Sequence, residues 1–422
     1  MSRARDNANL SPTIADARMP NLTGDVTTVE GAVATTIAND AVTGAKIENN
    51  PTIAGNLTVS GDLVPSTPLS HRNMIINGGM NVAQRGTSST SGGYQTVDRF
   101  QSGGGTIATT QSQESLSSSD TGPWEAGFRK AYKALTTNAT TSTAAYYSLL
   151  TILEAQDLAN SGWNYTSTSS YITLSFWALS NDAGAYTCSV RSQDGTSYYY
   201  DTTYTLVAGT WKKVEITIPG KSDLQFDNNT SQGIQIHPFI AYGTDYTASG
   251  SAGSWQTYNG AGGDETIPNT DATAWMNNSG SYIMITGVQL ELGSNATPFE
   301  HRSYGDELLR CQRYYYIIVD QQGGAASMIA NTGVYHTNLT YFYVGLPVQM
   351  RATGTLEQVS GTSYYLFYAN STGYETTGFT LGNPSLNAVR LVNNDGTMPT
   401  IGMAGWWQTS NDACFIAITA EL

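Results

Sequence analysis

The chain has 422 residues, a formal net charge of −14 at pH 7, and only 12% charged residues. Nucleic acids and anionic membrane surfaces attract proteins through clustered Lys and Arg, so this charge balance argues against both as partners. The Gly, Thr, Ser and Asn that separate the apolar residues favour strands and turns over helices. We therefore expect a mostly β protein with two or three units.

The first 93 residues contain no Phe, Trp or Tyr, and all aromatic residues of the chain follow them. Without the side chains that bury the most area, this region is not expected to build a core within one chain, and another copy of the same segment is the natural partner. Ile53, Leu57, Val59 and Leu63 share one parity, which predicts a dry strand face. We expect an attachment segment over residues 1–20 and an intertwined β shaft of a homotrimer over 21–70. A disordered linker is the alternative to the shaft.

Residues 71–302 contain strand-like segments separated by Gly, Asn, Asp and Ser. The segment YITLSFWALS, residues 171–180, alternates apolar and polar residues as a sandwich strand with one buried face does. GTWKKVEITIPG, residues 209–220, and SYIMITGVQLELG, residues 281–293, show similar alternation over part of their length. The spacing of these segments and turns predicts an antiparallel β-sandwich or jelly roll.

A helix is predicted only over residues 303–316, where acidic residues occupy the first turn and Leu308, Cys311 and Tyr315 recur at helical spacing. This apolar stripe has to be buried. The helix is expected either to form a short neck with its copies in a trimer or to pack on the sandwich of its own chain. Strand-like runs then fill residues 317–422, for which we expect a second, distal β-sandwich.

Several strings of residues resemble known families. The segments YITLSFWAL and GTWKKVEITIPG look like strands of jelly-roll carbohydrate-binding modules. The strings NMIINGGMNVAQRGTSS, GYQTVDRF and GVQLELGSNATPFEHRSYGDELLRCQRYYY are similar to segments of tail-fibre and minor structural proteins of tailed bacteriophages, particularly marine phages such as cyanophages. This second resemblance spans residues 73–316.

The resemblance implies a homotrimeric tail fibre whose N-terminal segment is fixed to adaptor or nozzle proteins of the phage tail. It also implies that the distal β-domain mediates host recognition and adsorption by binding cell-surface polysaccharide or lipopolysaccharide. The protein is then expected in the virion after synthesis in the host cytoplasm. A polysaccharide depolymerase tailspike and a purely structural virion fibre are the alternatives.

No catalytic pattern is recognisable in the sequence. The four histidines, His71, His237, His301 and His336, lack HExxH, CxxC or GxSxG spacing around them, so we predict that the protein is not an enzyme. Glycoside hydrolysis needs only a pair of carboxylates, which leaves that alternative open. The pairs His71-Arg72 and His301-Arg302 bracket the jelly-roll region. We expect them to bond to backbone or to Glu300 at the ends of the sandwich, with ligand binding as the alternative.

Aromatic residues are the candidates for sugar contact, because the C–H face of a pyranose stacks on indole and phenol rings. Core packing is the alternative for each of them. The first choices lie near the C-terminus, where the resemblance places recognition. The candidates are Trp406, Trp407, Tyr364, Tyr365, Tyr368, Trp255, Tyr258, Trp275, Trp163 and Tyr165.

One loop concentrates acidic residues. Asp264, Glu265 and Asp271 lie close together in the sequence and are weak candidates for a Ca²⁺ site, although solvated turns explain such a cluster better. No other cofactor is expected.

Overall fold

The computed structural model describes residues 26–27, 36–37, 70–246, 252–258, 272–320, 326–362, 364–393 and 397–422. It divides into two units, residues 1–64 and 65–422. In the first unit the strands β1 (Val26–Thr27) and β2 (Thr36–Ile37) pair antiparallel. The predicted attachment segment lies outside the described residues, as does most of the predicted shaft.

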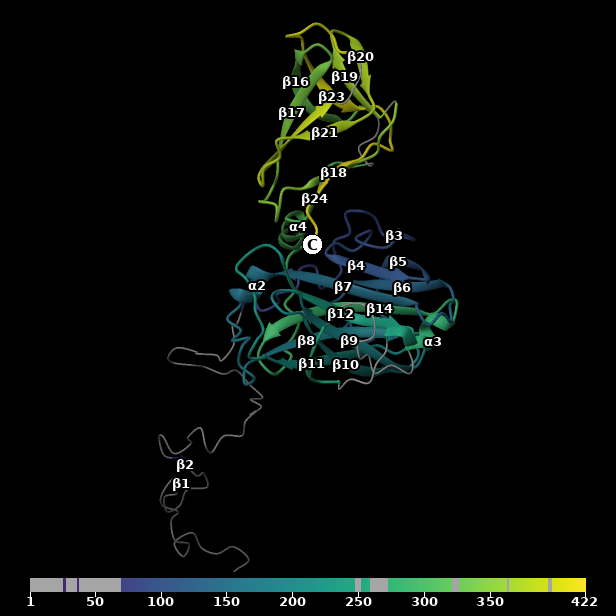
Figure 1. Cartoon of the computed structure of the whole chain (residues 1–422), viewed down its shortest axis with the longest axis vertical. Helices are drawn as coiled ribbons and strands as arrows, with labels where there is room; N and C mark the ends of the chain where they lie inside the picture. The colour runs from purple at the N-terminus through teal and green to yellow at the C-terminus, as the bar shows by residue number, and fades with distance from the viewer. Residues whose placement is uncertain are drawn as a thin grey trace, which may run out of the picture. The chain divides into compact units, whose positions relative to one another are not determined.

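Within residues 70–292, two antiparallel sheets of six strands each lie face to face (Figure 1). The first sheet has the order β13 (Trp255–Thr257), β10 (Tyr198–Leu206), β9 (Gly184–Ser192), β12 (Gln232–Tyr242), β7 (Tyr146–Glu154) and β4 (Phe100–Gly105). The second has the order β11 (Lys212–Pro219), β8 (Tyr171–Ser180), β14 (Tyr282–Leu292), β6 (Lys130–Asn138), β5 (Ala108–Ser115) and β3 (Ser88–Ser89). The described part of this region also contains three short helical segments: α2 (Ala155–Ala159), η3 (Thr244–Tyr246) and α3 (Ala272–Asn277).

The core of this sandwich follows the alternation read from the sequence. On β8, Ile172, Leu174 and Phe176 are buried between the sheets, with exposed fractions of 1% or less. The strand bounds 171–180, 212–219 and 282–292 lie within the three predicted segments, which confirms those predictions. The fold is mostly β, as predicted, because alternating apolar residues bury one face of each sheet against the other.

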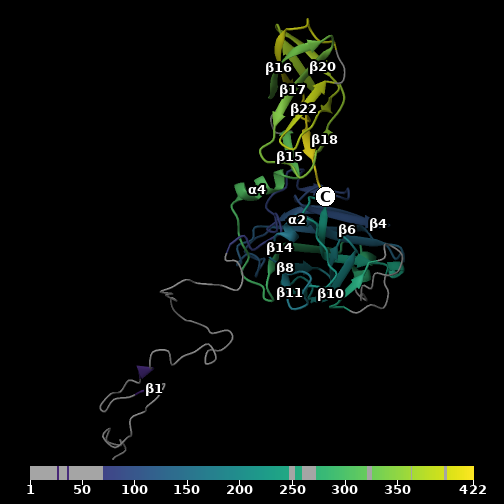
Figure 2. The ribbon, with the colours of Figure 1, turned by 60° about the vertical axis from the view of Figure 1, so that its left-hand side comes forward.

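The observed helix is shorter than the one predicted over residues 303–316. Helix α4 (Tyr304–Gln312) begins after Ser303, whose side chain accepts a hydrogen bond from the Asp306 amide, and it ends before Tyr315, the first residue of β15 (Tyr315–Val319; Figure 2). The helix is covered by its own chain, because Cys311 is fully buried and the Glu307 carboxylate accepts the backbone N–H of Asn77.

The C-terminal part contains a three-stranded and a seven-stranded antiparallel sheet. The smaller has the order β15, β24 (Ile416–Thr419) and β18 (Thr355–Gln358). The larger, called the C-terminal sheet below, has the order β20 (Thr372–Thr376), β19 (Tyr365–Ala369), β23 (Ala404–Thr409), β16 (Met328–His336), β17 (Leu339–Gly345), β22 (Ala388–Asn393) and β21 (Phe379–Gly382).

The C-terminal sheet is strongly curved. Strands β19 and β21 are separated by four strands in the sheet order, yet the rings of Tyr365 and Phe379 on these strands lie 5.1 Å apart. The sheet therefore curls around a core to which Phe367 and Trp407 also contribute, and its other face is convex. No helix among the described residues is long and apolar enough to cross a membrane.

Candidate functional site

The C-terminal sheet separates the sequence-predicted aromatic residues by parity. Trp406 on β23 points outward with 37% of its surface exposed, whereas its neighbour Trp407 is fully buried. The Trp407 indole donates a hydrogen bond of 3.0 Å to Thr340 Oγ1. Tyr365 is also fully buried, and its hydroxyl donates to two backbone carbonyl oxygens at 2.8 Å. Trp407 and Tyr365 are therefore core residues, which corrects their choice as sugar contacts.

Tyr368 and Trp406 form the first part of an exposed aromatic surface. They are paired in register on neighbouring strands, and their rings lie 5.0 Å apart at 44°. The indole N–H of Trp406 donates to Gln408 Oε1 at 2.8 Å, which fixes the orientation of the ring. Asn331 on β16 pairs with Trp406 from the other side, so an amide continues the row across the sheet. Tyr364, the remaining distal candidate, is half-buried and packs on Tyr365.

Three further tyrosines extend this surface, and the sequence reasoning missed them. Tyr335 on β16 is 64% exposed and Tyr343 on β17 is 65% exposed. Tyr341 lies between them, 5.1 Å from the Tyr335 ring and 6.0 Å from the Tyr343 ring. The alternation in LTYFYVG was the available signal, because Phe342 is the buried residue and the tyrosines on either side of it take the opposite face.

Arg390 on β22 adds a positive charge to the same surface. Its guanidinium carbon lies 5.3 Å from the centre of the Tyr341 ring, and its Nε has no hydrogen-bond partner among the described residues. A Cβ atom at Gly382 would lie 2.5 Å from that Nε, so the missing side chain on β21 makes room for the guanidinium. We call the outward side chains of Tyr368, Trp406, Tyr335, Tyr341, Tyr343 and Arg390 the aromatic face.

The aromatic face offers the chemistry of a saccharide platform. Indole and phenol rings accept the apolar C–H face of a sugar ring, and the phenol hydroxyls remain available for hydrogen bonds. Asn331, Gln408 and Arg390 supply polar groups beside the rings. Because the face is convex and exposed, it suits contact with an extended polymer better than enclosure of a small molecule.

The jelly-roll candidates are mostly part of the core. Trp275 is fully buried against Tyr147 and Phe239, with ring centres 5.2 and 4.9 Å away. Trp163 is 4% exposed and its ring centre lies 6.2 Å from that of Phe226. Burial corrects the choice of both tryptophans as sugar contacts, because they fill the space inside the sandwich.

The other jelly-roll candidates are half-buried. The indole N–H of Trp255 donates to the carbonyl oxygen of Pro219 at 2.7 Å. Tyr165 packs on Phe226 at 5.0 Å, and Tyr258 lies under the Arg191 guanidinium at 5.3 Å. The possible Ca²⁺ ligands Asp264, Glu265 and Asp271 lie outside the described residues. Among the residues that are described, no group of three or more His, Cys, Asp or Glu side chains is placed to hold a metal ion.

A polar row crosses the outer face of the first jelly-roll sheet. Register places Asp201, Ser189 and His237 side by side on β10, β9 and β12, and all three are buried. Burial, together with the charge of Arg191, holds the pKa of His237 well below its usual range, so the imidazole is neutral at pH 7. These side chains are less accessible to a polymer than the aromatic face is.

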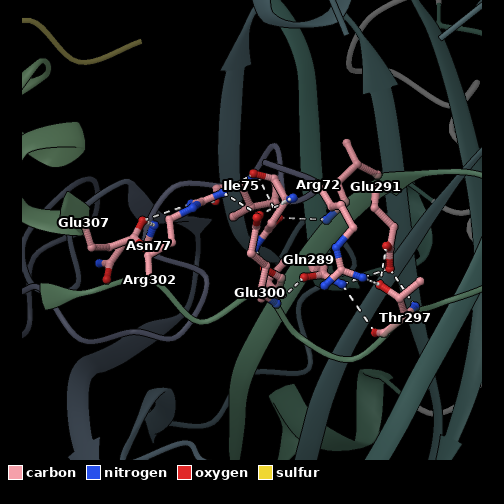
Figure 3. A network of polar contacts seen from close by, with 12 residues as sticks. Arg72, Ile75, Asn77, Gln289, Glu291, Thr297, Glu300, Arg302 and Glu307 are labelled. Carbon is pink, nitrogen blue, oxygen red and sulfur yellow. Dashed lines mark hydrogen bonds and ion pairs between the residues drawn. The ribbon is translucent and has the colours of Figure 1, made fainter. Parts of the chain in front are cut away.

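The arginines of the two His-Arg pairs, Arg72 and Arg302, join the ends of the jelly roll (Figure 3). Arg302 donates to the carbonyl oxygens of Asn73 and Ile75 and lies 3.4 Å from Glu300. Arg72 donates to Thr297 Oγ1 and, at 3.1 Å, to the carbonyl oxygen of Pro298. The prediction that these pairs bond to backbone or to Glu300 is confirmed for both arginines, since Arg302 contacts backbone and Glu300 and Arg72 contacts backbone.

No protein-family model matches the chain, and no curated protein matches it. Among solved structures, it is similar to the enzymatically active domain of tailspike protein 4 of bacteriophage CBA120, with 12% identity and a TM-score of 0.28, covering 52% of this chain and 21% of that one. It is also similar to a family 11 carbohydrate-binding module of a Clostridium thermocellum cellulase, with 15% identity, a TM-score of 0.25, and coverage of 51% and 98%. A cyclase from Fischerella sp. matches with 10% identity, a TM-score of 0.30, and coverage of 55% and 97%.

These similarities correct one expectation. The sequence predicted that the protein is not an enzyme, yet the similar structures include an enzymatically active tailspike domain and a cyclase. The exclusion was wrong because it rested on missing motifs, and a carboxylate pair that acts on a glycoside carries no sequence motif.

Proposed function

We propose that this chain is a fibre protein of a tailed-bacteriophage virion and that its aromatic face binds carbohydrate on the host-cell surface. The observation that carries the proposal is the gathering of exposed rings on one convex sheet face, with Trp406, Tyr335 and Tyr343 between 37% and 65% exposed. Soluble monomers seldom expose rings in contiguous groups without a binding role. The resemblance of residues 73–316 to phage tail-fibre segments supports the virion assignment.

The proposal includes a homotrimer held to the phage tail by its N-terminal segment. Single ring-to-sugar contacts are weak, on the order of 1 kcal/mol each. Copies of the aromatic face within one fibre would act together through their effective concentration, which converts weak sites into firm adsorption. Light scattering of the full-length protein tests this part directly, and a mass near three chains is the expected result.

Binding is tested with the full-length protein and with polysaccharide and lipopolysaccharide purified from bacterial strains, marine strains included. We expect Trp406→Ala and Tyr343→Ala each to weaken binding about fivefold per site, and more when several sites engage one polymer. Tyr171→Ala is the matched control, because this tyrosine is 38% exposed on β8 of the jelly roll. Equal loss in the control, or no loss in either variant, would contradict the assignment to the aromatic face.

The same incubations separate the alternative functions. Release of reducing ends from a bound polysaccharide would identify a depolymerase. Incorporation into virions without binding to cells or to any purified glycan would identify a purely structural fibre.

A further inference from the structure

Two adjoining cavities lie away from the aromatic face, where the first residues of the jelly roll meet α4. Their volumes are about 490 and 730 Å³. His71, Arg302, Arg310 and Arg313 line both of them. We call the space that these four residues share the basic cleft. It concentrates guanidinium groups in a chain whose net charge is −14.

Most arginines of the basic cleft have their donors in use. Arg313 binds Glu154 through two nitrogens, each at 2.8 Å. Arg302 is held by backbone carbonyl oxygens and by Glu300 and Glu307 (Figure 3). These contacts make the walls rigid, and they neutralise the charges of both guanidinium groups.

Arg310 differs from its neighbours. It lies in the last turn of α4, is half-buried, and makes no hydrogen bond or ion pair with the residues that the structure describes. An arginine presents N–H donors in a planar fork that matches a carboxylate, and the half-buried Arg310 keeps these donors available to a ligand. The geometry thus leaves one planar cation open toward both cavities.

The acidic groups around Arg310 do not satisfy it. Glu291 accepts hydrogen bonds from Thr297 and Gln289, Glu300 from the Asn73 amide, and Asp306 from Ser303. Asp157 on α2 lines the smaller cavity and accepts no hydrogen bond from the described residues. Burial and the charge of Glu154 raise its pKa to about 6, while the charges of nearby arginines, Arg310 included, oppose this shift without forming an ion pair. The Asp157 carboxylate is therefore open to a donor from a ligand, just as Arg310 is open to an acceptor.

The remaining walls of the smaller cavity suit a sugar ring. Met74, Ile76 and Leu292 provide apolar surface, while Gln156, Asn160 and Ser161 provide polar edges. A pocket that combines an apolar wall with a few convergent polar groups is typical of small-ligand sites, and this volume lies within their usual range of about 300–1,000 Å³. A saccharide that carries a carboxylate has a partner for each of these groups: its ring for the apolar wall, its hydroxyl groups for the polar edges and Asp157, and its carboxylate for Arg310.

We propose that the basic cleft binds an acidic monosaccharide unit, with its carboxylate on Arg310 and a hydroxyl group on Asp157. The ligand class is a uronic acid or another carboxylated sugar, either as a terminal unit or as the free monosaccharide. The site is separate from the aromatic face, so the failure of one assignment leaves the other standing.

The test uses the full-length protein and methyl β-D-glucuronide, followed by saturation-transfer NMR and calorimetry. Methyl β-D-glucoside is the matched probe without the carboxylate, and inorganic phosphate is the matched anion without the sugar. We expect Arg310→Gln to weaken glucuronide binding about 10- to 100-fold, because a charge-assisted hydrogen bond is lost. Arg310→Lys keeps the charge without the planar fork and should recover only part of the affinity. Lys213→Gln on β11 removes the same charge elsewhere and should leave the affinity unchanged.

Arg310→Gln is expected to fold normally, because Arg310 contributes no hydrogen bond or ion pair within the described structure, and its thermal unfolding should match that of the wild type. Absence of glucuronide binding to the wild-type protein would overturn the proposal. So would equal affinity for phosphate or for the neutral glucoside, because the site would then not recognise the carboxylate and the sugar together. Asp157→Ala should weaken glucuronide binding severalfold, and tighter binding in that variant would show that Asp157 only competes for Arg310.

Discussion

Removal of the charge on Glu421 should destabilise the protein strongly. Glu421 forms ion pairs with Arg85 and Arg99, and the side chains are 8%, 8% and 2% exposed, respectively. Arg99 also lies 3.4 Å from the centre of the Tyr314 ring. Burial alone would lower the pKa of Arg99, but the Glu421 carboxylate outweighs it and raises that pKa above its ordinary value. The carboxylate is therefore what makes the buried guanidinium tolerable.

Glu421→Gln keeps the shape of the side chain and leaves two buried guanidinium groups without their anion. Breaking a buried pair from one side costs about 3–5 kcal/mol. For a unit of this size the melting temperature should fall by roughly 4–7 °C. Urea unfolding followed by tryptophan fluorescence measures the free energy of unfolding directly.

The matched control is Glu215→Gln. Glu215 pairs with Lys213 at a similar distance, 2.7 Å, but the two side chains are 49% and 37% exposed. Solvent screens such a pair, so its loss should change the free energy of unfolding by less than about 1 kcal/mol. If Glu421→Gln costs no more than this control, the buried ion pairs stabilise the fold no more than an exposed pair does, and the reasoning from burial is refuted.

Three further changes test the fold. Trp407→Ala should cost about 3–5 kcal/mol in urea unfolding because Trp407 is fully buried, while Trp406→Ala should cost less than about 1 kcal/mol; equal costs would contradict the inward and outward placement. Gly287→Ala should cost about 1–3 kcal/mol, since φ is +67° and a Cβ would lie 2.6 Å from the Phe128 ring; unchanged unfolding would argue against that contact. Burial raises the pKa of Asp98 to about 6, although hydrogen bonds from Gln84 oppose the shift. Between about pH 4 and 6 the folded state therefore holds a proton on Asp98 that the unfolded chain has released. The stability of the wild type relative to Asp98→Asn should therefore fall by up to about 3 kcal/mol as the pH rises from about 4 to 7, and a difference independent of pH would contradict this shift.

Local patterns in the sequence predicted much of the fold. Strict alternation identified β8 and parts of β11 and β14, because a strand with one buried face needs apolar residues at every second position. The helix was predicted too long because the apolar spacing of Leu308, Cys311 and Tyr315 ignores the strand that Tyr315 enters by pairing with Thr419. A pairing partner more than a hundred residues away does not change the spacing of apolar residues near Tyr315, so the local pattern cannot reveal it.

The candidate site was only half predictable. Alternation places the consecutive residues Trp406 and Trp407 on opposite faces, but it does not say which face is inside. That choice came from the curvature of the C-terminal sheet, which brings Tyr365 and Phe379 together around Trp407 and leaves Trp406 with Tyr368 outside. Tyr335 entered the aromatic face only because β16 lies beside β17 in the sheet.

The sequence by itself determined the β class, the turn-rich spacing of the strands, and the polar role of the two His-Arg pairs, since these follow from properties of neighbouring residues. Only the tertiary structure decided which charges are satisfied. Arg99 meets Glu421 across 322 positions of the chain, whereas Arg310 lies within a few residues of several acids and pairs with none of them among the described residues. Electrostatic partnership depends on distance in space and on the water removed by packing, and neither quantity is contained in the order of the residues.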